Sequence, residues 1–307
     1  MRTPGPYRLP RSSSDRTLRV WGGVASRLLH VGASPVLVRA WQPGRERVRL
    51  RAEPVDPRTL RWPPLGPPRE PAPAGREQLA EAIERMRFAL ALDLDLADFK
   101  RRFRRDPLLG PLLRRLHDYR PLRRPWPWEA LATAVCGQLI EARRAAQIER
   151  RIIGRWGPRL GDGRAALRDV PGPATIAGRA PAELQALDLS GGRAIALRRL
   201  ARDVAAGRAR IESPAADRRL LATPEIGPWT VQCLALYGRG DLDSLPAGDL
   251  AYIKIVGHLR GEGRRATVPE VEEFYAPYAP YRGLAGCLTT VGLYRAVAAA
   301  PPLRLAA

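Results

Sequence analysis

The residues best placed to do chemistry lie in the segment SPAADRRLLATPEIGPWTVQCLALYGRGDLDSLPAGDLAYIK, residues 213–254. Ser213 followed by Pro predicts the capped start of a short helix that ends near Leu221, because Ser caps helices and Pro fits the first helical position. The residues TPEIG at 223–227 break this helix, and Pro228 opens a second one. The predicted helix-hairpin-helix presents free backbone N–H groups and a positive helix end at its tip, a cradle for phosphate. An ordinary pair of bundle helices is the alternative.

Asp249 follows the second predicted helix at the end of a loop. A carboxylate held in place can stabilise positive charge that develops in a transition state and can assist an attacking water. The alternative is a cap for the helix expected at 250–259, LAYIKIVGHL, because Asp commonly fills that position. Both roles can hold at once.

The overall charge indicates a polyanionic partner, with nucleic acid first and an anionic membrane surface second. The formal net charge is +21 over 307 residues. The only lysines are Lys100 and Lys254, so nearly all of the basic charge is arginine. A GC-rich coding sequence would produce the same bias whatever the function. The 45% of hydrophobic residues argues against a disordered chain.

The cysteines and the N-terminus exclude several classes of protein. Cys136, Cys233 and Cys287 are far apart and form no CxxC pair, which argues against a disulfide framework, a zinc site or an iron–sulfur cluster. The opening residues MRTPGPYRLPRSSSD contain no apolar run of the signal-peptide kind, and no stretch is long enough to span a bilayer. We therefore expect a reduced protein of the cytoplasm.

The predicted elements that must position these residues change from strands to helices along the chain. Residues 16–52 contain short β-type runs, TLRVW, SRLLHV, PVLVRAW and RVRLRA, separated by Gly, Pro and Ser. The Pro-rich stretch that follows fits neither a helix nor a central strand. The expected fold class is α+β: a small N-terminal antiparallel β domain at 1–60, a Pro-rich linker at 61–76, and a larger all-helical helix-hairpin-helix region at 77–307.

Helical patterns fill the region after the linker. In REQLAEAIERMRFAL, the residues Leu79, Ile83, Met86 and Leu90 form one apolar helical stripe. Two longer helices are expected where Gly closes an amphipathic run. These are WEALATAVCGQLIEARRAAQIERRIIGRWG at 128–157 and GGRAIALRRLARDVAAG at 191–207.

The hairpin followed by LPAGD at 245–249 resembles the helix-hairpin-helix DNA glycosylase superfamily, and most strongly its 3-methyladenine DNA glycosylase II family. Three further blocks are similar to family segments, and the resemblance covers roughly residues 78–295. The blocks are AVCGQLIEARRAA, GGRAIALRRLA and YAPYRGLAGCLTTVGLYR.

The resemblance implies an enzyme that flips a damaged nucleotide out of duplex DNA and hydrolyses its N-glycosidic bond. The family's essential aspartate falls on Asp249. Trp229 stands where bifunctional members of the superfamily carry a Schiff-base lysine, and neither Lys100 nor Lys254 lies in the hairpin. The resemblance therefore implies hydrolysis without lyase activity, with alkylated bases of the 3-methyladenine type as substrates.

The same resemblance suggests how the base is held and replaced. Trp229 is expected to line a pocket that accepts methylated cationic bases by stacking and cation–π attraction, with core packing as the alternative. Tyr278 and Tyr281 match a C-terminal aromatic region of the family and are further pocket candidates. Leu139 is the candidate wedge that fills the gap left by the flipped nucleotide, with a buried helix position as the alternative.

The expected DNA contacts come from two segments. Gln138 and Leu139 belong to the upstream block, and the hairpin contributes Thr230 and the backbone of Ile226 and Gly227. Family members often hold a cation through hairpin carbonyls, here those of Leu221, Thr223 and Ile226. We expect no metal site formed by side chains and no organic cofactor.

Glu225 is the main departure from the family pattern. The family has Gly there, which lets backbone approach phosphate, whereas a carboxylate would repel DNA. Cys233 and Leu250 also replace residues that are aromatic in some relatives, so the base pocket is expected to be less aromatic. A paralogue that binds distorted DNA with weak or no catalysis is therefore the alternative function. An iron–sulfur glycosylase is a third interpretation, but this sequence lacks the four clustered cysteines of such an enzyme.

The expected partner is double-stranded DNA containing damaged bases. We expect no membrane association, a monomer, and a bacterial cytoplasmic protein associated with the nucleoid.

Overall fold

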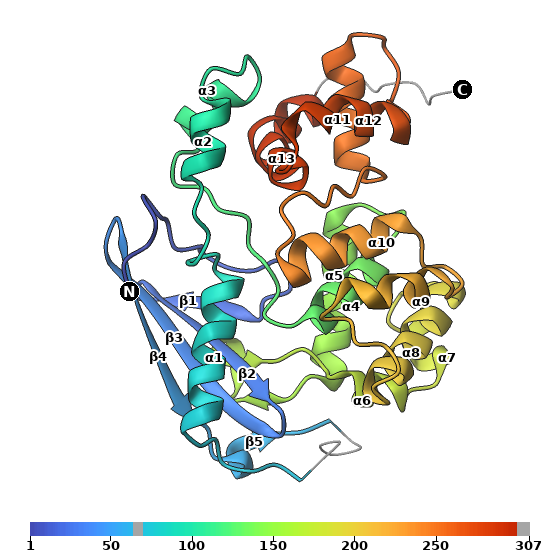
Figure 1. Ribbon diagram of the computed structural model, residues 1–307. Coiled ribbons are helices and arrows are strands. Elements are labelled where there is room, and N and C mark those ends of the chain that lie inside the picture. Colours follow the sequence, from blue (N-terminus) through green and yellow to red (C-terminus); the bar gives the residue numbers. More distant parts are fainter. Residues whose placement is uncertain (64–69, 300–307) are drawn as a thin grey trace.

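The computed structural model describes residues 1–63 and 70–299. Its N-terminal part is a four-stranded antiparallel sheet in the order β1-β2-β3-β4 (Figure 1). The strands are Leu18–Trp21, Val24–Val31, Ser34–Gly44 and Arg47–Pro54. Gly22 and Gly23 form the β1–β2 turn with φ of 55° and 77°, as a tight hairpin turn requires. The sheet predicted from the sequence is confirmed.

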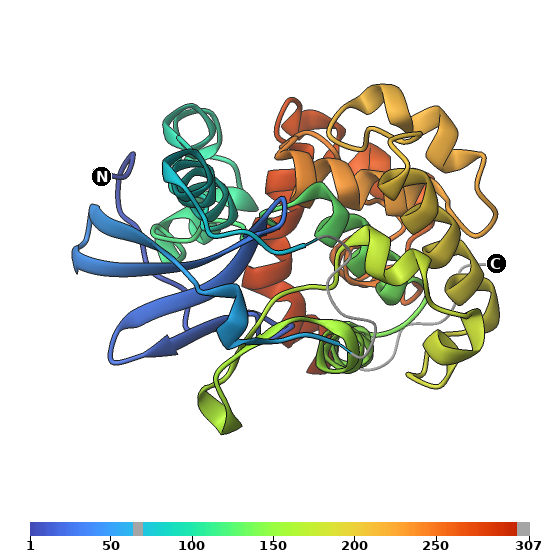
Figure 2. The same ribbon diagram turned by 90° about the horizontal axis from the view of Figure 1, so that it is seen from below.

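Helix α1, Arg76–Ala89, covers one face of this sheet (Figures 1 and 2). Its fully buried Met86 packs into one cluster with Ala25 and Val38 of the sheet. Burial of such side chains contributes about 1.5–3 kcal/mol each, which fixes the helix on the sheet. The predicted apolar stripe thus faces the strands.

A small three-stranded sheet, in the order β5-β6-β7, covers part of the opposite face. Its strands are Leu60–Arg61, Arg159–Leu160 and Leu167–Arg168. Leu28 and Leu37 of the large sheet are buried in one cluster with Leu60. Because β5 pairs with β6, the N-terminal region is joined to the helical region by backbone pairing.

The rest of the described chain is helical. The α-helices after α1 are α2 Ala97–Phe103, α3 Leu109–Arg115, α4 Pro127–Gly137, α5 Ala142–Trp156, α6 Pro173–Ala177, α7 Pro181–Gln185, α8 Gly191–Ala205, α9 Asp217–Leu221, α10 Pro228–Cys233, α11 Leu250–Arg260, α12 Val268–Tyr275 and α13 Arg282–Ala299. Short 3-10 turns lie at Pro57–Thr59, Gly163–Ala165, Pro214–Ala216 and Ala276–Tyr278, and a π-helical segment at Leu234–Arg239 continues α10.

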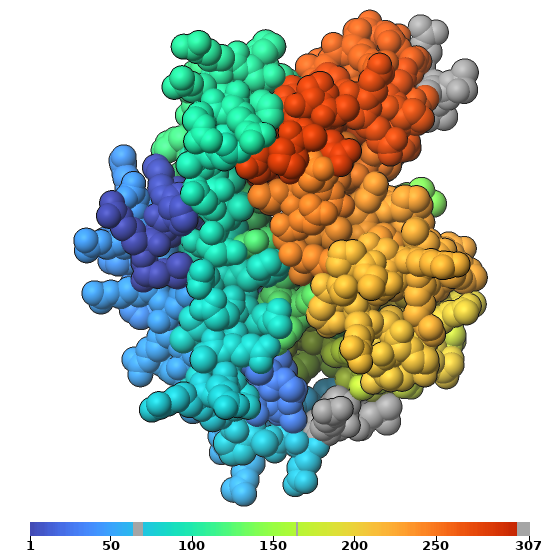
Figure 3. Space-filling model, in the orientation of Figure 1, coloured from blue at the N-terminus to red at the C-terminus, as the bar shows by residue number. Residues whose placement is uncertain are grey.

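The helices enclose two apolar cores. The first unites α4, α5, α8 and α10, with Trp128, Leu131, Ile148, Leu197 and Val231 among its buried members. The second unites α2, α3, α11, α12 and α13, with Phe99, Leu109, Tyr252, Tyr275 and Leu288 among its members. In the view of Figure 3, the C-terminal helices lie directly against the chain that follows α1, and little of the α4–α5 segment is visible between them.

The single helix predicted at 128–157 is wrong, because the structure has two helices, α4 and α5, separated by residues 138–141. Leu139 adopts a left-handed conformation with φ of 56°, which a continuing α-helix excludes. The apolar and polar periodicity continues through the break, so the sequence pattern does not reveal it.

Buried ion pairs join the sheet to the helices. Nη2 of Arg27 on β2 lies 2.5 Å from Oε2 of Glu129 on α4, and the two side chains are 5% and 2% exposed. Arg124 pairs with Asp15 and, at 3.0 Å, with Glu149 of α5. Although burial opposes it, the nearby Arg124 and Arg27 hold the pKa of Asp15 well below its usual range.

Residues 64–69 of the expected linker and residues 300–307 of the expected helical region lie outside the described residues. The division into 1–60, 61–76 and 77–307 as separate domains stays a prediction. No helix in the described parts of the chain is both long and apolar enough to cross a membrane.

Candidate active site

Asp249 occupies the N-cap position of α11. Its Oδ1 accepts a hydrogen bond of 2.8 Å from the N–H of Ala251, and its own N–H donates to the carbonyl of Pro246 at 2.8 Å. These bonds hold the carboxylate against the helix N-terminus. Burial raises the pKa of Asp249 above its usual value, while the Ala251 N–H and the nearby Trp229 indole oppose that rise. The expected cap geometry is therefore present together with a desolvated carboxylate.

Trp229 of α10 connects this aspartate to the end of α4. A Cβ atom on Gly137 would lie 3.5 Å from Cη2 of Trp229, and one on Gly248 would lie 3.7 Å from Cβ of Trp229. The two glycines thus leave room for the ring between α4 and the loop that carries Asp249. The indole Nε1 is buried and makes no hydrogen bond of normal geometry within the described part of the chain, although it lies near the Asp249 carboxylate.

The hairpin joins α9 to α10, as Ser213 and Pro228 predict. Ser213 caps the 3-10 turn that precedes α9 by accepting from the N–H of Ala215 at 3.3 Å, and α10 begins at Pro228. In the hairpin, the N–H of Ile226 donates to the carbonyl of Thr223 at 3.0 Å. The N–H of Gly227 has no acceptor among the residues that the structure describes. The helix-hairpin-helix predicted from the sequence is present, with its tip open for an anion.

Leu139 lies on the loop between α4 and α5 with 97% of its surface exposed. Leaving an apolar side chain in water forfeits about 1.5–3 kcal/mol of burial free energy, and its exposure leaves Leu139 free to contact a partner. A buried helix position, the alternative for this residue, is not what the structure shows.

Gln138 fastens this loop to the hairpin. Its Nε2 donates to the carbonyl of Glu225 at 2.6 Å and to Oγ1 of Thr230 at 2.9 Å. From the other side, Nη1 of Arg193 on α8 donates to the carbonyls of Cys136 and Gln138 at 3.2 Å each. The exposed leucine is therefore carried by a loop whose backbone is held in place.

The chain matches no family model and no curated protein. The structure is similar to a 3-methyladenine DNA glycosylase from Archaeoglobus fulgidus, with a TM-score of 0.77 at 16% identity over 96% of this chain and 98% of that one. This chain has the fold of the helix-hairpin-helix DNA glycosylases. The fold class expected from the resemblance is confirmed.

Two further structures share this glycosylase fold. MBOgg1 in complex with a low affinity DNA ligand has a TM-score of 0.71 at 17% identity, covering 97% of this chain and 95% of that one. The 8-oxoguanine glycosylase/lyase of Clostridium acetobutylicum, in complex with double-stranded DNA containing cytosine opposite 8-oxoG, has a TM-score of 0.63 at 15% identity. That match covers 88% of this chain and 87% of the other.

Within the glycosylase fold, Glu225 takes a conformation that favours glycine. Its φ is 70°, and its side chain is exposed. Oε1 of Glu225 lies 2.8 Å from the point where a Cβ atom of Gly192 would stand. The carboxylate therefore lies at the N-terminus of α8, where the positive end of the helix dipole stabilises it.

Tyr278 and Tyr281 point toward α2 and the residues that follow it. The hydroxyl of Tyr278 donates to Asp106 at 3.4 Å, and that of Tyr281 donates to Asp98 at 2.8 Å. The ring of Tyr281 packs edge-on against Phe99. These contacts do not bring either tyrosine together with Trp229 and Asp249, so their place in a base pocket stays a prediction.

The hairpin carbonyls proposed for a cation also stay a prediction. One of them, that of Thr223, already accepts the N–H of Ile226 and keeps one lone pair. In the described ranges, no group of three or more His, Cys, Asp and Glu side chains could hold a metal ion.

Arg193 is a site residue that the sequence reasoning did not single out. It lies in the block GGRAIALRRLA, where its type resembles the many other arginines of the chain. Nothing local identifies its two carbonyl acceptors, Cys136 on α4 and Gln138 on the α4–α5 loop, because they are 57 and 55 residues away.

Proposed function

We propose that the protein is a DNA glycosylase that hydrolyses the N-glycosidic bond of alkylated, 3-methyladenine-type bases after flipping the nucleotide. One observation carries the proposal: Trp229 lies against both Gly137, two residues before the exposed Leu139, and Gly248, the neighbour of Asp249. The exposed Leu139, as the wedge, and the desolvated carboxylate of Asp249 would thus act near opposite ends of one aromatic ring. The glycosylase fold supports the same conclusion.

The hairpin would bind one phosphate of duplex DNA. The unpaired N–H of Gly227 and the positive end of α10 lie at its tip. With the duplex held there, Leu139 would enter the base stack and occupy the space of the extruded nucleotide. The Gln138 bonds to Glu225 and Thr230 would keep the wedge in register with that phosphate.

Asp249 would act on the sugar. The bond between C1′ and the base nitrogen breaks, and its electron pair leaves with the base, which departs neutral when alkylation had made it cationic. The carboxylate of Asp249 stabilises the positive charge that develops on the sugar. Water then adds to C1′ and gives up a proton, for which the carboxylate is the acceptor.

The reaction would stop at an intact abasic site. Strand cleavage of the lyase type needs an amine nucleophile. The hairpin has Trp229 where such an amine would stand, and Lys100 instead donates to the carbonyl of His117 at 2.9 Å. Borohydride trapping on lesion DNA should therefore give no covalent complex, and a trapped complex would contradict hydrolysis alone.

The substrate is tested by incubating the full chain with duplexes that carry 3-methyladenine, 7-methylguanine, hypoxanthine, uracil or 8-oxoguanine, followed by alkaline cleavage. We expect release of the methylated bases, and Asp249→Asn as the matched control should release them about 10²-fold more slowly or not at all. Tight binding to these duplexes without release of any base would instead indicate a paralogue that recognises distorted DNA. We propose that the protein works as a monomer on the damaged DNA of the bacterial nucleoid, in the cytoplasm.

A further inference from the structure

The face of the large sheet opposite α1 carries a dense group of arginine and tryptophan side chains. Residues that pair across antiparallel strands point to the same side of a sheet. The pairing therefore places two rows on this face, one of Trp21, Val24, Trp41 and Arg49 and one of Arg19, Ser26, Arg39 and Arg51. The alternate positions, such as Val38 and Ala40, are fully buried under α1. Arg47 alternates with Arg49 and Arg51 along β4, and we call Arg47 and the two rows together the arginine–tryptophan face.

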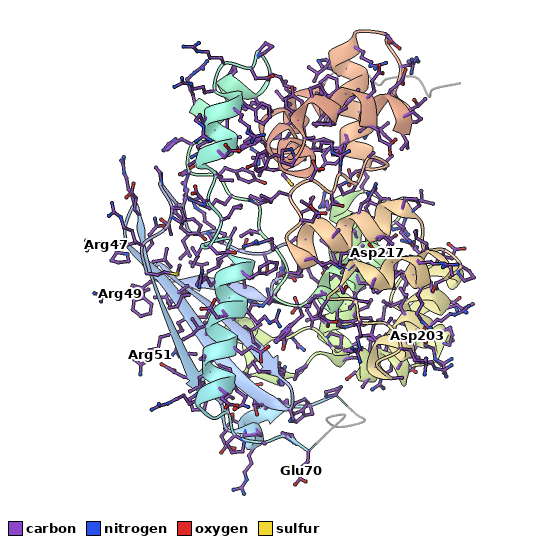
Figure 4. The ribbon with its side chains drawn as sticks, in the orientation of Figure 1. Arg47, Arg49, Arg51, Glu70, Asp203 and Asp217 are labelled. Carbon is purple, nitrogen blue, oxygen red and sulfur yellow. The ribbon has the colours of Figure 1, made fainter. Side chains whose placement is uncertain are left out.

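Part of this face is open to solvent: Arg49 and Arg51 are exposed, whereas Arg19, Val24, Ser26, Arg39 and Trp41 are half-buried. The small sheet β5-β6-β7 covers the neighbouring row, where Leu28 and Leu37 are buried, and its strand β7 also approaches Arg19. Trp21 is 90% exposed, at the tip of the β1–β2 hairpin. Figure 4 shows Arg47, Arg49 and Arg51 along β4, at the edge of the molecule farthest from α9 and α10.

The charge of the face is not balanced by carboxylates. Glu53 pairs with both Arg39 and Arg51, the latter at 2.9 Å. Within the described part of the chain, Arg19, Arg47 and Arg49 have no carboxylate within ion-pair distance. An anionic ligand would supply the missing charge.

At its β1 end the face meets further arginines. Burial lowers the pKa of Arg168 on β7 below its usual value. The like charges of Arg159 and Arg19 lower it further. The Nε atoms of Arg19 and Arg159 are buried without a hydrogen-bond partner among the described residues.

We propose that the arginine–tryptophan face binds a single strand of nucleic acid. Alternate residues along a strand are about 6.6–6.8 Å apart, so Arg47, Arg49 and Arg51 can meet consecutive phosphates of one extended chain. Trp21 and Trp41 lie two strands apart, about 10 Å, and offer platforms on which unpaired bases stack. An acidic polypeptide would match the arginines but would leave the exposed tryptophan without a partner.

Such a site is separate from the hairpin, because the sheet and the α9–α10 hairpin lie on opposite sides of the molecule (Figures 1 and 4). It goes beyond the proposed function and does not depend on it. A strand that has left the duplex could be held on the sheet while the hairpin holds the duplex.

The test measures the affinity of the full chain for a fluorescent oligodeoxythymidine at several salt concentrations. The first variant is Arg47→Gln/Arg49→Gln/Arg51→Gln, and its charge-matched control is Arg104→Gln/Arg105→Gln/Arg114→Gln, three exposed arginines near α2 and α3. We expect the sheet variant to lose about tenfold in affinity or more at low salt. Its salt slope should fall by about 2, since each single-strand phosphate contact contributes roughly 0.7. The control should lose clearly less.

Trp21→Ala separates stacking from charge. It should weaken oligonucleotide binding about fivefold or more without changing the salt slope, because one base loses its platform. Excision from lesion duplexes should stay at the wild-type level, and Asp249→Asn should bind the oligonucleotide normally. If the protein excises no base at all, the oligonucleotide affinity still measures binding by the arginine–tryptophan face. Failure of the proposed glycosylase function and failure of single-strand binding can therefore be told apart.

Three results would overturn the proposal. The first is equal loss of affinity in the two arginine variants, which would reduce the effect to overall charge. The second is unchanged binding by Trp21→Ala, which would leave the β4 arginines as protection against strand pairing at a sheet edge. The third is displacement of the oligonucleotide by polyglutamate as readily as by unlabelled oligonucleotide, which would indicate a site for acidic polypeptides.

Discussion

Asp249 is the N-cap of α11, and we propose that the same side chain also has a chemical role. As the N-cap of α11 it satisfies the N–H of Ala251, and as a desolvated carboxylate it is suited to a positively charged transition state. Asn caps helices as well as Asp does, but it cannot carry the charge. The two roles can therefore be separated by substitution.

Asp249→Asn should lower single-turnover excision by about 10²-fold or more, because removal of one preorganised electrostatic group at a reacting centre typically costs that much. The melting temperature should stay the same or rise, since the cap remains and a buried charge is removed. Asp249→Ala is the control, and loss of the cap should destabilise it by about 1 kcal/mol. Substantial excision by the Asn variant would leave Asp249 as a cap only.

The rate of excision should fall as the pH is lowered, with an apparent pKa above the ordinary aspartate value of about 4. Burial raises the pKa of Asp249 in the folded protein, so its carboxylate is lost at a higher pH than usual. For the same reason ionised Asp249 costs stability at neutral pH, and that cost vanishes as the pH falls below the unfolded value. The stability gained by Asp249→Asn should therefore be largest near neutral pH, as urea unfolding at several pH values can check.

Leu139→Ala should reduce excision from duplex DNA about tenfold more than excision from single strands. A wedge acts only where a base stack must be opened and kept open. Because Leu139 is 97% exposed, its truncation should change the free energy of unfolding by no more than about 0.5 kcal/mol. Equal losses on the two substrates would argue against a wedge.

At the scale of elements, the hairpin is held by long-range contacts on two sides. Gln138 reaches it from the α4–α5 loop, and Glu225 extends from it to the N-terminus of α8. The carboxylate that departs from the family pattern thus has a structural partner. Its left-handed backbone nevertheless carries a strain of about 1 kcal/mol that glycine would not have.

Glu225→Gly should tighten non-specific DNA binding several-fold at low salt, with a smaller effect at high salt. One negative charge is removed near the phosphate that the hairpin holds, and salt screens the remaining difference. Glu225→Gln is the matched control, because it removes the charge but keeps the side chain and the left-handed backbone. If neither variant binds more tightly, the carboxylate at α8 does not act on bound DNA.

At the scale of the molecule, buried ion pairs connect the sheet to the helices that carry the site. Arg27 and Glu129 are nearly inaccessible to solvent, and burial raises the pKa of Glu129, with Arg27 opposing that rise. A buried pair of this kind is costly to break from one side only, because the remaining charge stays desolvated.

Arg27→Met should destabilise the protein by about 3–5 kcal/mol, whereas Arg27→Met/Glu129→Met should recover most of that loss. Urea unfolding of the wild type, both single variants and the double variant gives the coupling energy. If the changes in unfolding free energy of the two single variants simply add in the double variant, the pair does not link the sheet to α4.

Much of the fold and part of the site could be predicted from the sequence, because they depend on neighbouring residues. Short β-type runs separated by Gly, Pro and Ser in residues 16–52 predicted the four strands, and Ser213 and Pro228 predicted where the helical segments of the hairpin begin. The N-cap position of Asp249 follows from the helix pattern after it. Caps, turns and periodicity act over a few residues, so the local sequence determines them.

Only the tertiary structure decided the rest. The break after α4 is set by the bonds of Gln138 to residues 87 and 92 positions away. The orientation of Tyr281 toward Asp98, and the pairing register that aligns Arg19 with Arg39 and Arg51, also join distant parts of the chain. Such contacts depend on which surfaces meet when the chain packs. Local residue preferences do not specify which distant residue a side chain will contact.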